Sequence, residues 1–312
     1  SPRKKELAEN CHPFAVEIKD FTKPVDILAV DVPAGYTTLF VFPYSVGFQF
    51  SGFKNLAALN EAITKRLKNL GVTTLLFMRH LELIEYEIKI PGKEASGEYL
   101  LDAEAVNDHC TRVSAIESED DKTDESLSFI KFSMPIDSMV STRTIDVAFT
   151  VATDKEGKTT FQKAKNPYIS VYFPTETESK LDFIVQGPFR TTPNRSSVPA
   201  DEEENEALAE QTAKLLRQSV LELRDMGLLD LSLIRILPLD EDDFDVYPLF
   251  YPLYEEMRDL FSSERVLPVK DGKGYTKAAN AVIARSREIA ELLPSELISE
   301  LINGKRHYEL FC

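Results

Sequence analysis

The sequence predicts an α+β fold, in which a mixed, mostly antiparallel sheet with a packed helix is followed by a mainly helical domain. Alternating apolar and polar residues, with β-branched and aromatic runs, fill most of the chain up to about residue 190. One helical repeat, at residues 56–70, interrupts these strand signals. After residue 198 the apolar residues follow helical spacing. A chain of 312 residues is long enough for two or three packed units.

The first part of the chain combines strand and helix patterns. The predicted elements are strands at residues 13–23, 37–44, 72–78 and 81–90, and a helix at residues 56–70. The helix is predicted because leucines and one isoleucine recur every three or four residues, and Gly71 follows as a C-cap. Residues 72–78 are a short apolar run, which is typical of a buried strand. Pro91 and Gly92 end the last strand of this region.

The region from residue 91 to residue 198 is predicted to be almost entirely β-structure. Its predicted strands are residues 98–101, 105–116, 126–134, 144–153, 158–163, 168–173 and 181–187. The acidic stretch at residues 117–125 is predicted to be a solvated hairpin tip, because its carboxylates lack the spacing of a calcium-binding loop.

The region after residue 198 is predicted to be mainly helical. Asp201 followed by Glu204 has the pattern of a helix start. The predicted elements are a long helix at residues 202–226, a helix at residues 249–261, a hairpin at residues 266–276, and two closing helices that begin at Thr276 and Ser295. The predicted domain boundaries therefore give three regions, residues 1–90, 91–198 and 199–312.

The charge of the chain excludes some classes of partner. Lys and Arg total 36 and Asp and Glu total 52, so the formal charge is −16 and phosphate backbones are repelled. We therefore expect no nucleic-acid partner. No apolar run is long enough to span a bilayer, so no membrane partner is expected. The three cysteines, Cys11, Cys110 and Cys312, lie far apart and predict an intracellular, reducing compartment such as the cytoplasm.

Residue sets for catalysis or metal binding are sparse. The chain has no Gly-x-Ser-x-Gly elbow and no Gly-rich phosphate loop. Cys11-His12 and His109-Cys110 are two adjacent thiol–imidazole pairs, and a zinc site would need all four side chains to converge. Neighbouring residues of a strand point to opposite faces, so isolated structural residues are the favoured interpretation. We expect no enzymatic activity of this chain by itself.

The most informative segment follows a predicted strand. Gln186 precedes Gly187-Pro188, and Arg190 and Arg195 lie on either side of Pro193. The prolines restrict the backbone, so little entropy is lost in holding the two arginines in place. Paired guanidinium groups suit an anionic oxygen cluster such as a phosphate. The alternative is that both arginines pair with the many acidic residues of the chain.

Several stretches resemble the middle region of large GHKL-type ATPases, the histidine-kinase-like and Hsp-ninety-like ATPases that include sacsin-like proteins. The resemblance is carried by YFPTETESKLDFIVQGPFRTTPNRSSVP, by the long helix and LPLDEDDFDVYPLFYPLYEEM after it, and by VLPVKDGKGYTKAANAVIAR. GYTTLFVFP, residues 35–43, is similar to the last strand of the GHKL nucleotide domain, in which a Gly-Thr strand closes the adenine pocket. The resemblance therefore implies a cofactor-binding role for Thr37 and Thr38.

The resemblance implies that the chain begins inside the ATPase domain. The family's helix with a Glu and a metal-binding Asn, its Asp-x-Gly strand and its Gly-rich lid are not found ahead of residue 35. Residues 1–90 are then the terminal strands and helix of that domain, residues 91–198 a transducer-like domain and residues 199–312 a helical domain. This fragment is expected to hold no cofactor, while ATP and Mg²⁺ are implied for the complete protein.

The resemblance also implies a function and its residues. In GHKL ATPases the middle domain lends a polar or basic residue to the γ-phosphate of ATP, and Arg190, Arg195 and Gln186 are the candidates here. The fragment is then non-catalytic and belongs to a chaperone- or defence-like machine. It couples the ATP state of a missing N-terminal ATPase domain to downstream domains or protein clients. The alternative function is a stand-alone protein-interaction module without nucleotide chemistry.

Overall fold

The computed structural model describes residues 55–78, 80–90, 92–119, 122–136, 143–270, 274–283, 287–292, 294–302 and 309–310. The strands predicted at residues 13–23 and 37–44, with Thr37 and Thr38, lie outside these residues, as do Cys11, His12 and Cys312. The chain divides into two compact units, residues 1–65 and 66–312. Helix α4 (Leu56–Lys68) confirms the helix predicted from the leucine spacing.

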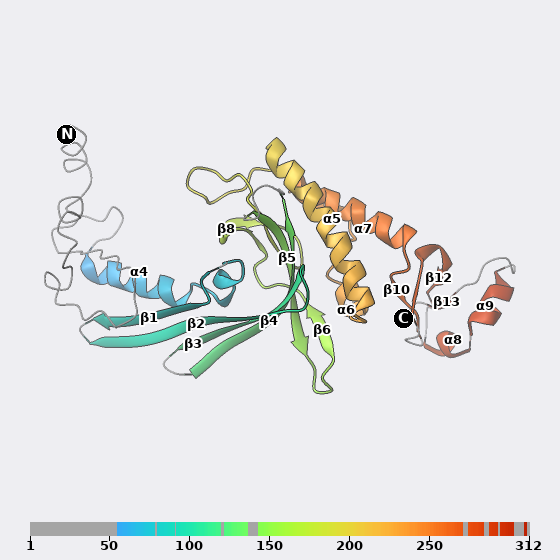
Figure 1. Ribbon diagram of the computed structural model, residues 1–312, viewed down its shortest axis with the longest axis horizontal. Coiled ribbons are helices and arrows are strands. Elements are labelled where there is room, and N and C mark those ends of the chain that lie inside the picture. Colours follow the sequence, from blue (N-terminus) through green and yellow to red (C-terminus); the bar gives the residue numbers. More distant parts are fainter. Residues whose placement is uncertain are drawn as a thin grey trace. The chain divides into compact units, whose positions relative to one another are not determined.

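The second unit contains a nine-stranded, mostly antiparallel sheet (Figure 1). Its strands are β1 (Leu83–Ile90), β2 (Lys93–Ala105), β3 (Cys110–Glu119), β4 (Lys122–Pro135), β5 (Thr144–Thr153), β6 (Thr159–Gln162), β7 (Tyr168–Val171), β8 (Phe173–Glu178) and β9 (Ile184–Gln186). The strand order is β1-β2-β3-β4-β5-β9-β7-β8, and β6 pairs with β5. Within the described sheet, β7 and β9 are the parallel pair. Together with the helices, this sheet confirms the α+β class.

Strand ends differ from the predictions where the chain turns. β3 and β4 continue into the acidic stretch predicted to be a loop, and Glu117 pairs with Glu125 across the hairpin. The strand predicted at residues 168–173 is divided into β7 and β8 at Tyr172, whose φ is 64°. A non-glycine residue in this left-handed region reverses the chain direction at a conformational cost, and no apolar pattern signals it.

The strand predicted at residues 72–78 is wrong. Val72–Leu75 form a 3₁₀ helix, η2, with local bonds such as Thr74 N–H to the Gly71 carbonyl at 3.0 Å. Val72, Leu75 and Leu76 are buried. A short, continuously apolar segment fits a buried helical turn as well as a buried strand, because hydrophobicity alone does not distinguish them.

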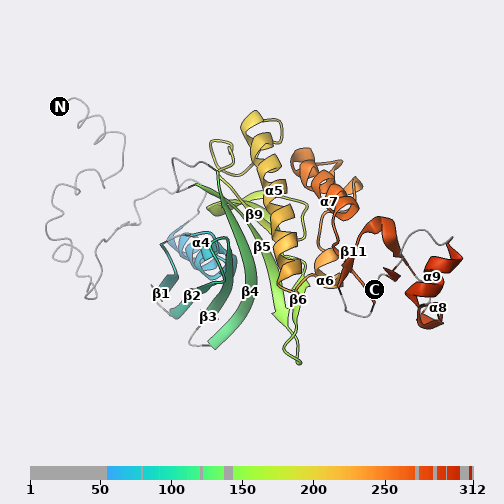
Figure 2. The same ribbon diagram turned by 45° about the vertical axis from the view of Figure 1, so that its right-hand side comes forward.

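Helices α5 (Glu203–Asp225), α6 (Leu231–Ile234) and α7 (Tyr251–Ser263) follow the sheet. Helix α5 packs against β4 and β5, α6 packs against β6, and α7 packs against α5 (Figures 1 and 2). Both long helices were predicted within two residues of these bounds. Asp201 does not cap α5, because Glu202 is the N-cap residue and makes no side-chain cap bond.

The last described elements are short. They are η3 (Asp242–Phe244), η4 (Pro248–Phe250), β10 (Leu267–Pro268), β11 (Tyr275–Thr276), η5 (Ala278–Asn280), β12 (Ala281–Val282), α8 (Arg287–Leu292), α9 (Ser295–Leu301) and β13 (Glu309–Leu310). The antiparallel pair β10 and β11 confirms the predicted hairpin, and α9 begins at Ser295 as predicted. The helix start at Thr276 is wrong, because this buried residue belongs to β11.

Side chains on the two faces of the sheet belong to different hydrophobic clusters. The helix-facing cluster joins alternate residues of β4 and β5 to α5, α6 and α7. The opposite cluster joins the other residues of these strands to residues 72–77. Val198 belongs to the helix-facing cluster, which continues across the boundary predicted at residues 198–199, and the three domain boundaries stay a prediction. No helix in the described part of the chain is long and apolar enough to cross a membrane.

Candidate functional site

The segment from Gly187 to Pro199 leaves β9 and leads into α5, and Asn205 of α5 holds it at two points. The backbone N–H of Arg190 donates to Asn205 Oδ1 at 2.7 Å. Asn205 Nδ2 donates to the carbonyls of Arg190 at 3.1 Å and Pro199 at 2.8 Å. Asn205 is completely buried. The segment and the first turn of α5 are therefore one hydrogen-bonded structure.

The part of the segment around Pro193 is a closed turn. Arg195 N–H donates to the Thr192 carbonyl at 2.7 Å, and Thr192 N–H donates to the Ser197 carbonyl at 2.9 Å. Asn194 Oδ1 accepts the hydroxyls of Thr192 at 2.7 Å and Ser196 at 2.9 Å. The turn carries Arg195 in the left-handed region, with φ 60°.

The end of the segment is fixed to β8 and to the helical region. The Ser196 carbonyl accepts a hydrogen bond from Glu176 N–H at 2.9 Å, and Val198 N–H donates to Thr177 Oγ1 at 3.0 Å. The Tyr247 hydroxyl donates to the Val198 carbonyl at 2.8 Å. Burial raises the pKa of Tyr247, so its hydroxyl stays protonated and remains a donor.

Arg190 is paired with an acidic residue. Its Nη2 donates to Glu204 Oε1 at 2.8 Å, and its Nε donates to the other carboxylate oxygen. The hydrogen bond to Glu204, and then the charge of Glu204, raise the pKa of Arg190. Because both side chains are more than half exposed, the pair adds little stability. For Arg190 the structure therefore agrees with the ion-pair alternative of the sequence analysis.

Arg195 differs from Arg190 in this respect. Its Nη2 donates to the Val171 carbonyl at 2.9 Å. Within the described residues no carboxylate forms an ion pair with it. Because a guanidinium group has five N–H donors, Arg195 keeps donors for an anionic oxygen.

Gln186 lies inside the sheet. Only 2% of its surface is exposed, and in the described structure its Oε1 has no hydrogen-bond partner. It pairs in register with Asp146 of β5 and Ser170 of β7, both of which are also buried. Such an unpaired buried oxygen lowers the free energy of unfolding by about 1–3 kcal/mol, so it destabilises this face of the sheet.

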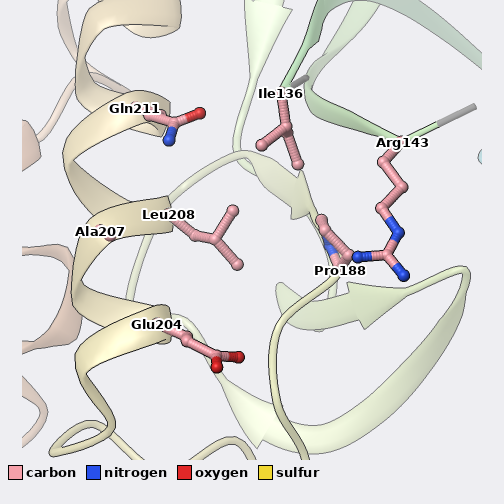
Figure 3. A pocket seen from close by; sticks show the side chains of 7 residues that line it. All are labelled: Ile136, Arg143, Pro188, Glu204, Ala207, Leu208 and Gln211. Carbon is pink, nitrogen blue, oxygen red and sulfur yellow. The ribbon is translucent and has the colours of Figure 1, made fainter. Parts of the chain in front are cut away.

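A pocket of about 440 Å³ lies beside the segment (Figure 3). One wall is α5, which contributes Glu204, Ala207, Leu208 and Gln211. Ile136, Arg143 and Pro188 contribute the remaining lining. Ala207 and Leu208 each lie three or four positions from both Glu204 and Gln211, so the four residues share one face of the helix. This pocket was not predicted.

The Arg143 side of the pocket is fixed by the backbone. Ile136 N–H donates to the Arg143 carbonyl at 3.0 Å, which holds the ends of β4 and β5 together. In the described part of the chain, the Arg143 guanidinium pairs with no carboxylate. Among the described residues, the pocket therefore combines an apolar surface with one arginine that forms no ion pair.

The His109-Cys110 pair has a structural role. Asn107 Oδ1 accepts from the N–H groups of His109 and Cys110, both at 2.8 Å, and so forms the turn between β2 and β3. Burial, and then the charge of Glu222, raise the pKa of the Cys110 thiol to about 11. Among the described residues, no group of three or more His, Cys, Asp or Glu side chains is arranged to hold a metal ion.

Comparison with known proteins does not identify a relative. No protein-family model, no curated protein and no solved structure matches the chain.

Proposed function

We propose that this chain is the transducer portion of a larger GHKL-type ATPase in a reducing intracellular compartment. It passes the ATP or ADP state of a preceding ATPase domain to downstream domains or protein clients of a chaperone- or defence-like machine. In this proposal residues 1–90 are the end of the ATPase domain, residues 91–198 the transducer-like domain and residues 199–312 a helical domain. The chain by itself catalyses no reaction.

The observation that carries the proposal is the attachment of the segment to α5 through Asn205. The segment with the most specific resemblance to GHKL middle regions is also the one whose backbone bonds to both sides of a buried helix side chain. Any displacement of the segment therefore moves the start of α5. A transducer requires a rigid element that is displaced by a contact at one place and thereby moves a second element.

Arg195 is the strongest candidate for the γ-phosphate contact within this proposal. Its guanidinium retains free donors on a closed turn, whereas two donors of Arg190 are occupied by Glu204. Gln186 is buried and could reach a phosphate only if the strands around it separated. ATP and Mg²⁺ belong to the preceding domain and supply the phosphoryl chemistry, and Arg195 contributes charge stabilisation.

The test is ATP turnover by the protein extended at its N-terminus through the upstream reading frame. We expect Arg195→Ala to lower turnover by about a hundred-fold, because removing a donor to developing charge has an effect of that order. We expect little change for Arg190→Ala. Arg235→Ala, at an exposed arginine after α6, is the matched control. Normal turnover of the Arg195 variant would show that the residue has another role.

The alternative function is a stand-alone protein-interaction module, and the pocket beside α5 favours it. Binding of an ATP analogue to this chain and to the extended protein distinguishes the two functions. Binding gained only on extension supports the transducer. Absence of binding in both supports the interaction module.

A further inference from the structure

The pocket beside α5 combines a fixed apolar surface with a cation. Leu208 is 8% exposed and belongs to the helix-facing cluster, and Ile136 packs against that cluster. Because these side chains are held by the core, the apolar surface exists without a ligand. The volume of about 440 Å³ lies within the range of roughly 300–1,000 Å³ that is typical of ligand pockets.

The charges around the pocket favour an anion. Arg190 and Glu204 neutralise each other through two hydrogen bonds. The Arg143 guanidinium adds one positive charge without a carboxylate partner in the described structure. A planar guanidinium beside an apolar surface is suited to a carboxylate that is attached to an apolar group.

The open side of the pocket favours a ligand that continues outside it. Glu204 and Ala207 are both exposed, so the α5 wall does not enclose a bound group. Gln211 is half-buried and has an amide that can both donate and accept, as a peptide group requires. Figure 3 shows the Leu208 and Ile136 side chains directed towards each other across the pocket, with Gln211 on the next turn of α5.

We propose that this pocket binds the C-terminal residue of a partner protein, with its carboxylate on Arg143 and its apolar side chain on Ile136, Pro188 and Leu208. The Gln211 amide pairs with the last peptide group of the partner. This inference is independent of the proposed function, because it requires no nucleotide and no preceding domain.

The test measures binding of short peptides to the whole 312-residue chain by isothermal titration calorimetry. The probe is acetyl-glycyl-seryl-leucine with a free carboxylate, and the comparison is the same peptide as its C-terminal amide. Because a charge-assisted hydrogen bond is lost, we expect the amide to bind at least about ten-fold more weakly. Isocaproate, which has the carboxylate and branched side chain but no peptide group, is expected to bind more weakly than the peptide acid.

Three variants locate the binding. Arg143→Met retains the aliphatic stem and should weaken the peptide acid about ten-fold, whereas Arg235→Met, outside the pocket, should not. Glu204→Gln removes the carboxylate that neutralises Arg190 and so adds a positive charge near the pocket. It should strengthen binding of the peptide acid a few-fold. Ala207→Trp fills the pocket from an exposed helix position and should abolish binding while the circular dichroism spectrum is retained.

The proposal is overturned if the acid and amide bind equally, or if Arg143→Met binds like the unsubstituted chain. Weaker binding in Glu204→Gln would also overturn it, because that result indicates a cationic ligand. If isocaproate binds as tightly as the peptide, the ligand is a small organic acid and the partner-protein form of the proposal is wrong.

Discussion

The two faces of the sheet are built differently. The helix-facing cluster is extensive and joins residues of six strands, β3, β4, β5, β6, β7 and β9, to helices α5, α6 and α7. The opposite cluster is smaller, and buried polar residues continue from it along β5, β7 and β9. These residues are Asp146, Ser170 and Gln186. The stability of the second unit therefore comes mainly from the helix-facing side, whereas buried polar groups on the other side carry a cost in free energy.

The largest difference between the faces is expected for buried phenylalanines. The Phe149 ring is fully buried against Phe132, Phe161 and Phe183, with ring centroids 5.2–6.3 Å apart. Phe149→Ala should lower the unfolding free energy by about 3–5 kcal/mol. Urea unfolding followed by circular dichroism measures it, since the chain has no Trp.

The matched substitution on the other face is Phe129→Ala. Phe129 lines a cavity of about 40 Å³, so its surroundings have more freedom to relax after truncation. We therefore expect a smaller loss than for Phe149→Ala. A loss of unfolding free energy equal to or larger than that of Phe149→Ala would contradict the conclusion that the helix-facing side contributes more to stability.

A pH-dependent effect is expected on the helix-facing side at Cys110. Burial raises the pKa of its thiol from 9.0 to about 11, so the unfolded thiol ionises before the folded one as pH increases. Stability is therefore fully present below pH 9 and decreases as pH rises towards 11, by about 2 kcal/mol at most. Unfolding curves at pH 8 and pH 10.5 should show a larger decrease for the unsubstituted chain than for Cys110→Ala. Equal decreases would exclude this linkage.

Tyr99 supplies a smaller effect on the opposite face. Its hydroxyl donates to the Leu67 carbonyl at 2.7 Å, and 1% of the residue is exposed. Tyr99→Phe removes the hydrogen bond and retains the ring, so we expect a loss of about 1 kcal/mol. Ile88→Val, at a buried strand position on β1, gives a similar loss without affecting a hydrogen bond and serves as a reference.

The smallest effect is expected at Gln186. Replacing it with Leu removes the cost of the unpartnered oxygen, but the branched side chain has to fit a buried site shaped for an amide. Because these two effects oppose each other, the unfolding free energy should change by less than about 1 kcal/mol. If Gln186→Leu instead destabilised the chain by about 2 kcal/mol or more, the amide would contribute to the fold. The polar character of this face would then be a source of stability.

Local sequence signals predicted much of the fold. Alternation gave β1, β5 and β6 almost to the residue, and the gap between the strands predicted at residues 144–153 and 158–163 matches the turn after β5. In that turn Asp154 Oδ1 accepts from the N–H groups of Glu156 at 2.9 Å and Lys158 at 2.8 Å, while Gly157 has φ 82°. Side chains that bond to their own turn leave a sequence signature, which is why such features are predictable.

Long-range features were not predictable in this way. The position of β9 between β5 and β7 depends on pairing between distant strands, and nothing in a three-residue strand specifies its neighbours. The buried turn at Val72–Leu75 has the composition of a strand, and Thr276 has that of a helix cap. In each of these cases tertiary packing decides between two local structures of similar free energy.

The site was predicted in part. The sequence located the segment with Arg190 and Arg195, but it could not separate the two residues, because the partner of Arg190 lies on a helix that follows. Asn205 was missed although it carries a signal, since it is a polar residue at an apolar position of the α5 repeat. Arg143 has no such signal, and its place beside α5 follows from the packing of β5.

The left-handed conformation of Arg195 has a consequence for how its role can be isolated. Glycine adopts φ 60° freely, while arginine does so at a cost of roughly 1 kcal/mol. Arg195→Gly therefore removes the guanidinium and at the same time relieves the backbone. A variant that melts at the same or a higher temperature, yet loses the ATP turnover that we propose to depend on Arg195 in the extended protein, would separate what this side chain does from how the protein folds.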